Sequence, residues 1–168
     1  MTAEALGALA AEAHRLLRLR RATLATAESL TGGLVAAALT DVAGSSATFR
    51  GGVVAYATDL KADLLGVDVP LLRRVGAVHP EVAATMARGA RDRLQATYGL
   101  ATTGVAGPDG QDGRPPGEVH LALAGPGAGR FGVAVESLQL PGDRAAVRAA
   151  AVHRAVALVV DTLGNSHL

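Results

Sequence analysis

Hydrophobic positions along the chain alternate between helical spacing and short apolar runs. Residues 4–20 carry leucine and alanine at helical spacing, which predicts an amphipathic helix. Residues 22–27 form a short apolar run that predicts a buried strand, and residues 32–40 predict a second helix. The further elements predicted in this way are a strand over 50–56, a short helix over 58–67 with Thr58 as its N-cap, a long helix over 80–98, a strand over 99–107 that runs into a glycine loop, strands over 117–124 and 130–138, and a final helix from 141 onward.

This alternation of strands and helices predicts an α/β fold layered around one sheet. The last two strands flank the turn GPGAG and read as a hairpin, so the sheet is expected to be mixed. The expected architecture is a three-layer α/β/α sandwich with a mixed central sheet. Neither an internal repeat nor a linker divides the sequence, and residues 1–168 are therefore expected to form a single domain.

Composition excludes several classes of function. The net charge is only +1, and the four aromatic residues give no stacking platform, so nucleic-acid binding is not expected. The chain has no cysteine, which excludes disulfides, thiolate metal sites and a cysteine nucleophile. The amino terminus does not read as a signal peptide, and no apolar run approaches the roughly 18 residues of a membrane helix. These observations predict a cytoplasmic protein.

The basic residues show one asymmetry, because Lys61 is the only lysine among sixteen lysines and arginines. Lysine can lose its proton in a protein, whereas arginine cannot. In the predicted helix, Lys61 shares a stripe with Leu64 and Leu65 and falls in the first turn. Burial and the helix dipole both lower the pKa of a lysine there, which favours a catalytic base. The alternative is a lysine whose tip reaches water.

Hydroxyl groups near Lys61 in the sequence suggest a partner for such a base. Ser45 and Ser46 stand in the segment GSS before the strand over 50–56, and Tyr56 closes that strand. A Ser–Lys pair requires no histidine, and the five histidines of the chain form no evident constellation. Turn serines are also common helix caps, so the segment GSS is a weak signal by itself.

Two loops and one arginine could contact an anionic group. The segments ESLTGG and TTGVAGPDG each follow a predicted strand, where backbone N–H groups can face an anion. Neither segment is a Walker loop or a dinucleotide-binding fingerprint. Arg144 lies in PGDR, in the opening turn of the last helix, where it could contact a phosphate.

Together these segments resemble the CinA carboxy-terminal domain family, whose stand-alone members include nicotinamide mononucleotide deamidases. The resemblance spans most of the chain, without the amino-terminal domain of full-length CinA proteins. The matching segments are TAESLTGG (26–33), DVAGSSATFRGGVVAYATDLK (41–61), GAVHPEVA (76–83), TGVAGPDG (103–110) and PGDR (141–144).

The resemblance implies hydrolysis of the carboxamide of nicotinamide mononucleotide to nicotinate mononucleotide and ammonia, without a metal or another cofactor. It implies Ser46 as the nucleophile and Lys61 as its base. It also implies a small-molecule substrate as the partner, and a homo-oligomer. The supporting residues implied are Tyr56 and Ser29 for hydrogen bonding and, in the two loops and the last helix, Thr31, Gly32, Thr103, Gly104 and Arg144 for substrate binding.

The sequence departs from the family pattern at few positions. Ala57 and Thr58 stand where many members carry serine and asparagine, and Leu30 replaces a frequent cysteine. Two other functions stay open at this point. One is a nucleotide-binding or interaction module without turnover, linked to competence or DNA damage. The other is an amidase for a different small amide.

Overall fold

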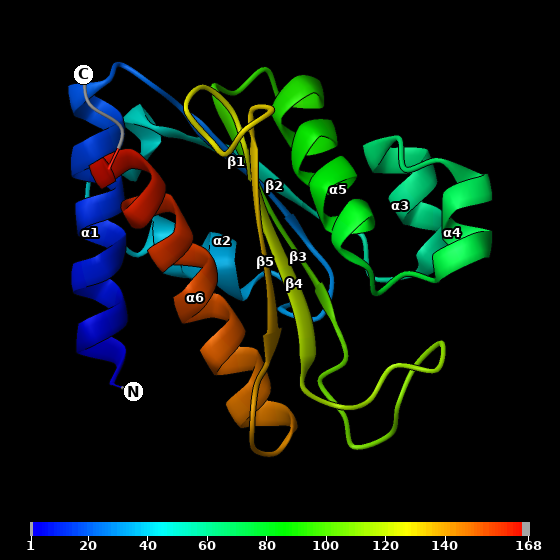
Figure 1. Ribbon diagram of the computed structural model, residues 1–168. Coiled ribbons are helices and arrows are strands. Elements are labelled where there is room, and N and C mark those ends of the chain that lie inside the picture. The colour runs from blue at the N-terminus through cyan, green and yellow to red at the C-terminus, as the bar shows by residue number, and fades with distance from the viewer. Residues whose placement is uncertain (1, 166–168) are drawn as a thin grey trace.

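A mixed five-stranded sheet lies at the centre of the molecule, as the sequence predicts. The computed structural model describes residues 2–165 (Figure 1). The strand order is β2-β1-β3-β4-β5, with β1 parallel to both β2 and β3, and with antiparallel pairing from β3 through β5. The strands are β1 (Leu24–Glu28), β2 (Phe49–Val54), β3 (Tyr98–Gly104), β4 (Glu118–Ala124) and β5 (Val133–Gln139).

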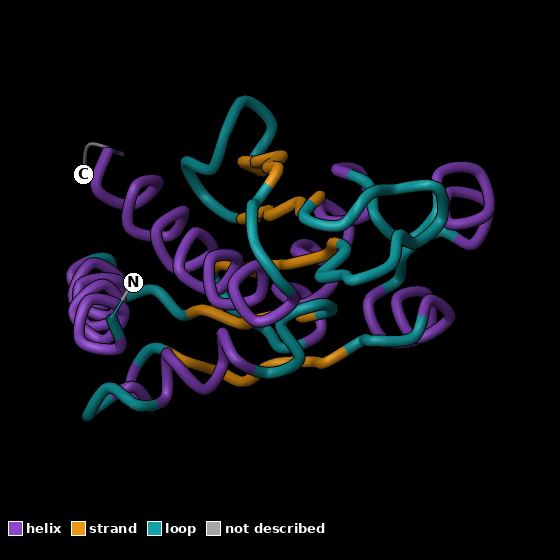
Figure 2. Tube along the Cα trace, turned by 90° about the horizontal axis from the view of Figure 1, so that it is seen from below, coloured by secondary structure: helices purple, strands orange, loops and turns teal. Residues whose placement is uncertain are grey.

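Helices cover both faces of the sheet, which gives the expected three layers (Figures 1 and 2). One face packs against α1, α2 and α6, and the other packs mainly against α5, with α3 and α4 beyond it. The helices are α1 (Ala3–Leu19), α2 (Leu34–Thr40), α3 (Thr58–Leu65), α4 (Val69–Val75), α5 (Pro80–Arg93) and α6 (Arg144–Asn165), with a short 3-10 helix, η1 (Ser45–Ala47), before β2.

Close packing on the α5 face brings α3 towards the sheet. This core contains many alanines, and two glycines permit the nearest backbone approaches. A Cβ on Gly99 would lie 1.9 Å from the carbonyl oxygen of Ala87 in α5, and one on Gly89 would lie 2.0 Å from that of Leu65 in α3. Any side chain at either position would therefore push these elements apart.

The loops that carry the candidate site residues meet at one edge of the sheet, at the lower end of Figure 1. Because β1, β2 and β3 are parallel, their carboxyl ends lie side by side there. The first turn of α6 and the loop between β3 and β4 reach the same edge (Figure 1). In an open α/β sheet, ligands bind at this edge, where successive connections leave a central strand on opposite faces.

Apart from shifts of up to three residues at the ends of elements, the observed elements differ from the predicted ones in three main respects. Thr58 is the first residue of α3 and Ala57 is its N-cap, with no side-chain cap. The helix α4 was not predicted, because a seven-residue segment with Pro70 near its start resembles a turn in sequence. The long helix ends at Arg93 rather than at Tyr98, which begins β3. Gln95 ends this region with a positive φ of 51°, a conformation that its residue type does not signal.

Candidate functional site

The only lysine of the chain is buried at the functional edge of the sheet. Lys61 is 1% exposed and lies in the first turn of α3. Its Nζ lies 2.8 Å from the carbonyl oxygen of Ala55, 3.2 Å from that of Tyr56 and 3.0 Å from Ser29 Oγ. The tip of the side chain therefore does not reach water. The predicted stripe is correct for Leu65, which is buried, and wrong for Leu64, which is 41% exposed.

Burial changes the proton affinity of this lysine. Removal from water lowers the pKa of Lys61 from its ordinary value of 10.5 to about 8. The carboxylates of Asp112 and Asp59 act in the opposite direction and limit the decrease. Asp112 is held in place because its Oδ2 accepts the N–H of Ala77 at 3.1 Å. The result is an amine that exchanges its proton close to neutral pH.

The three acceptors around Nζ define which atom the neutral amine can activate. A neutral amine has two N–H groups and one lone pair. When its two N–H groups donate to the carbonyl oxygens of Ala55 and Tyr56, the lone pair is left for the hydroxyl of Ser29. A carbonyl oxygen has no proton to give, whereas a hydroxyl does. The geometry thus suits proton transfer from Ser29 to Lys61.

Ser29 is fixed by the strand on its other side. It directly follows β1, and its N–H donates to the carbonyl oxygen of Thr102 in β3 at 3.0 Å. The side chain of Ser29 is 8% exposed and lines a cavity of about 230 Å³. The serine is therefore both held by the sheet and open to a small ligand.

A buried carboxylate holds the start of α2 after this serine. Glu28 is 1% exposed, and its two oxygens accept the N–H groups of Gly33, Val35 and Ala36 at 2.8–3.0 Å. Gly33 is the N-cap of α2 and brings no side chain that could accept these bonds. Glu28 supplies the missing cap from outside the helix, and so fixes the loop that begins with Ser29.

Arg144 connects two segments at the rim of the cavity through hydrogen bonds. Arg144 donates to the carbonyl oxygen of Gly107 at 2.8 Å and to the hydroxyl of Tyr56 at 2.9 Å. These contacts join α6, the loop after β3 and the segment after β2. The cavity is lined by Ser29, Leu30, Tyr56, Gly104, Val105, Ala106, Gly107, Asp109, Gly110, Gln111 and Arg144.

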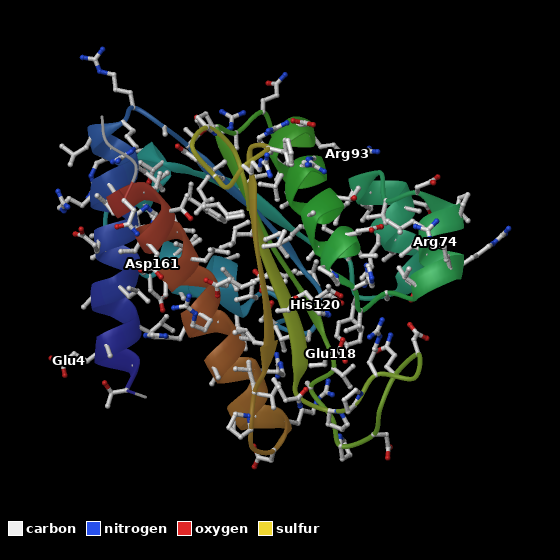
Figure 3. The ribbon with its side chains drawn as sticks, viewed as in Figure 1. Glu4, Arg74, Arg93, Glu118, His120 and Asp161 are labelled. Atoms are coloured by element: carbon white, nitrogen blue, oxygen red, sulfur yellow. The ribbon has the colours of Figure 1, made fainter. Side chains whose placement is uncertain are left out.

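A second, larger cavity of about 610 Å³ is lined in part by the loop that carries Asp112. Three arginines line it, namely Arg73, Arg74 and Arg114, together with Thr58 and Asp112. Figure 3 shows Arg74 on α4 and Glu118 at the start of β4, with the loop between β3 and β4 at the lower right. Arg74 also forms an ion pair with Glu81, and Arg114 forms one with Glu118.

Within residues 2–165, no group of three or more His, Asp or Glu side chains is placed to hold a metal ion. The same residues form no helix that is both long enough and apolar enough to span a membrane.

Known proteins share this sequence and this fold. Residues 6–163 match the family model described as the CinA C-terminal domain. The chain belongs to this family. A CinA-like protein from Frankia casuarinae is 58% identical over 144 residues, which cover 86% of this chain and 32% of that protein. A CinA-like protein from Geobacter sulfurreducens is 52% identical over 80% of this chain. The chain spans about a third of the length of these curated relatives.

Solved structures agree with the family assignment. A CinA superfamily protein from Klebsiella pneumoniae superimposes with a TM-score of 0.89 at 33% identity, over 96% of this chain and 99% of that one. A competence/damage inducible protein from Agrobacterium tumefaciens gives a TM-score of 0.87 at 36% identity, over 94% of both chains.

In this CinA C-terminal domain, the structure corrects the predicted partner of Lys61. Ser46 is exposed and lies in η1, before β2, whereas Tyr56 and Lys61 follow β2. The six residues of β2 between them span about 20 Å. Ser46 therefore lies at the opposite edge of the sheet, and the serine in contact with Lys61 is Ser29. Tyr56 is at the site, through its carbonyl oxygen to Lys61 and its hydroxyl to Arg144.

The residues predicted to bind substrate fall into two groups. Ser29, Gly104 and Arg144 line the smaller cavity. Thr31 and Thr103 are buried and their hydroxyls are engaged within the protein, with Thr102 Oγ1 and with the carbonyl oxygen of Ala77, respectively. Gly32 is exposed with a positive φ of 59° and does not line that cavity.

Four residues that support the candidate site were not predicted from the sequence. Glu28 and Asp112 hold loops through backbone N–H groups, and Thr102 anchors Ser29. Arg148 donates to the carbonyl oxygens of Leu30 and Thr31 from one turn beyond Arg144. Glu28 could have been predicted as a cap, because an acidic residue stands shortly before a helix whose N-cap is a glycine. The sequence offered no such signal for Arg148, which reads as one more exposed helical arginine.

Proposed function

We propose that this CinA C-terminal domain is a serine amidohydrolase that removes the carboxamide nitrogen of nicotinamide mononucleotide, with Ser29 as nucleophile and Lys61 as base. The observation that carries the proposal is the 3.0 Å contact between Lys61 Nζ and Ser29 Oγ in a buried setting. A hydroxyl beside an amine of lowered pKa is the arrangement that nucleophilic catalysis requires.

The reaction proceeds in two halves. Neutral Lys61 takes the proton of Ser29 while Oγ attacks the carboxamide carbon and forms a tetrahedral intermediate. The resulting ammonium of Lys61 gives its proton to the departing nitrogen, the C–N bond breaks, and ammonia leaves an ester on Ser29. Lys61 then takes a proton from water, and the hydroxide attacks the ester. The C–O bond to Ser29 breaks, Oγ recovers a proton, and the carboxylic acid is released.

Arginines that line the two cavities support an anionic substrate rather than free nicotinamide. Arg73, Arg74 and Arg114 line the larger cavity, and Arg144 stands on the rim of the smaller one. A phosphate group is favourably bound by guanidinium groups. The smaller cavity, of about 230 Å³, has room for the ring and the carboxamide.

Ammonia release tests the proposal directly. The protein is incubated in parallel with nicotinamide mononucleotide, free nicotinamide and nicotinamide adenine dinucleotide, and ammonia is measured with time. We expect release from the mononucleotide at a kcat/KM at least about 100-fold above that for the other two compounds. If none of the three compounds releases ammonia, the proposal is contradicted. If another small amide releases ammonia faster, the protein is an amidohydrolase with that amide as its substrate.

The pH dependence of the rate follows from the pKa of Lys61. Only the neutral amine can accept the proton of Ser29, and that form predominates above a pKa of about 8. We therefore expect kcat/KM to fall about tenfold for each pH unit below 8 and to level off above it. Initial rates of ammonia release between pH 6 and 10 measure this profile. A rate that rises as the pH falls would contradict a lysine base.

A further inference from the structure

The backbone after Ser29 leaves two N–H groups without an acceptor. From Ser29 to Ala36, the N–H groups donate to Thr102, to Glu28 or within the loop itself, except those of Leu30 and Thr31. Among residues 2–165 neither of these two has an acceptor. Both residues are buried, Leu30 at 3% exposure and Thr31 at 0%. Buried N–H groups are almost always paired, so two in succession beside a nucleophile call for a ligand.

The carbonyl ends of the same two peptide groups are held in place. The carbonyl oxygen of Ser29 accepts the N–H of Gly32 at 3.0 Å, and that of Leu30 accepts Arg148 Nε at 3.0 Å. Arg148 Nη2 also donates to the carbonyl oxygen of Thr31 at 3.2 Å. A trans peptide is planar, so each N–H points opposite to its carbonyl. The N–H groups of Leu30 and Thr31 therefore point away from the groups that hold those carbonyls.

We propose that the N–H groups of Leu30 and Thr31 form the oxyanion hole of Ser29, and that Arg148 is a positioning residue that aims the second of them. This inference rests on the proposed amidohydrolase function. Leu30 lines the cavity together with Ser29, so the first donor belongs to a residue at the ligand. Backbone N–H groups that follow a nucleophile commonly stabilise the oxygen of a tetrahedral intermediate.

Glu28 and Arg148 have complementary effects on this loop. Glu28 engages the N–H groups of Gly33, Val35 and Ala36 and so removes them from competition for a ligand. Arg148 holds carbonyl oxygens on the opposite side of the peptide chain. Its planar fork suits two neighbouring carbonyls better than the single ammonium of a lysine does.

The test changes Arg148 and follows two reactions of Ser29. Arg148→Gln removes the charged fork, Arg148→Lys retains one charged donor group, and Arg154→Gln is the matched control. Arg154 lies on the same helix and makes comparable contacts, but with Glu136 and Asp161. The first reaction is amide hydrolysis, resolved into kcat and KM. The second is modification by a small fluorophosphonate, in which Ser29 Oγ bonds to phosphorus, fluoride leaves and Lys61 takes the proton.

We expect Arg148→Gln to lower both kcat and the rate of fluorophosphonate modification by about 10- to 100-fold, with KM within about twofold. Arg148→Lys should recover part of this loss, and Arg154→Gln should stay within about twofold of the wild type in both reactions. Peptide mass spectrometry locates the modification, and thermal unfolding shows that each variant is folded. The inference is overturned if Arg148→Gln changes only KM, or if it changes neither kcat nor KM. It is also overturned if Arg148→Gln fails to fold while Arg148→Lys keeps full activity.

The two reactions separate this inference from the proposed function. If the wild type releases no ammonia from any amide but Ser29 is modified, and Arg148→Gln slows that modification, the oxyanion hole stands and the amide substrate is wrong. If the wild type hydrolyses the amide and Arg148→Gln changes neither reaction, the function stands and the oxyanion hole is wrong. A wild type that undergoes neither reaction overturns both.

Discussion

Lys61→Met is expected to lower kcat by about 10³-fold or more while leaving the protein folded. Methionine matches the length of the lysine side chain closely and tolerates irregular packing, so the buried position is filled. The amine that contacts Ser29 is lost, and among residues 2–165 it is the only basic group within hydrogen-bond distance of that hydroxyl. Ammonia release measures the loss, and circular dichroism verifies the fold.

The same variant should also change how stability depends on pH. The folded protein holds Lys61 at a pKa of about 8, below its ordinary value of 10.5. Below pH 8 both states are protonated, and burial of the charge costs about 3 kcal/mol. Between pH 8 and 10.5 the unfolded chain still binds the proton that the folded protein has released. Stability of the wild type therefore rises with pH over this range.

The single lysine makes this effect measurable. No other lysine titrates in the range, and the two tyrosines are present in both proteins, so their contribution cancels in the difference. We expect the free energy of unfolding of the wild type to gain about 3 kcal/mol relative to Lys61→Met between pH 8 and 10.5. Urea unfolding at several pH values measures it. A constant difference across this range would mean that Lys61 is not perturbed in the folded state.

The fold could be predicted from the sequence because each layer leaves a periodic signal. Apolar stripes marked the long helices, and short apolar runs marked the strands of the sheet. The helix α4 was missed because its short sequence has Pro70 near the start and resembles a turn. The end of α5 was missed because Gln95 adopts a positive φ without the glycine that usually marks such a turn. These are failures of local signals rather than of the layer pattern.

The candidate site was predicted in part. The burial of Lys61 could be predicted from its position on a helical stripe with Leu65. Its partner was not predicted correctly, because Ser46 and Tyr56 are close to Lys61 in sequence, whereas Ser29 is 32 residues away. The register of β1 against β2 pairs Glu28 with Val54 and so brings the residues after both strands together. Parallel strands end at the same edge of a sheet, and the segment ESLTGG follows β1 just as Tyr56 and Lys61 follow β2. This rule therefore favours Ser29 as the serine near Lys61.

Asp112 and Arg148 show why the remainder could not be predicted. Asp112 acts on Lys61 through its charge and is held by the N–H of Ala77, whereas Arg148 acts through the carbonyl oxygens of Leu30 and Thr31. Such contacts depend on how a loop or a helix docks onto the sheet, and neither spacing nor composition encodes that. A sequence pattern can identify a residue whose type is unusual, such as the single lysine. It cannot identify a residue whose role depends on which backbone groups it contacts in the folded protein.

Ser29→Ala and Ser46→Ala form the sharpest comparison between the two candidate nucleophiles. Ser29→Ala is expected to lower kcat by at least about 10³-fold, because the attacking oxygen is lost. Lys61 keeps the carbonyl oxygens of Ala55 and Tyr56 as acceptors, so the site stays assembled and substrate should still bind. Ser46→Ala is expected to keep kcat within about twofold and to change stability by no more than about 0.5 kcal/mol, because Ser46 is exposed.

Both serines precede a backbone segment that a hydroxyl could cap, so loss of activity in one variant alone could reflect a local structural change. Unfolding curves of the two variants exclude that explanation if their midpoints agree with the wild type. Fluorophosphonate modification provides the second readout, since it should label Ser29 in Ser46→Ala and leave Ser29→Ala unlabelled. The opposite pattern, with Ser46→Ala inactive and Ser29→Ala active, would require Ser46 to approach Lys61 across the length of β2. The parallel pairing of β1 with β2 opposes such a movement, because it fixes the two ends of that strand at opposite edges of the sheet.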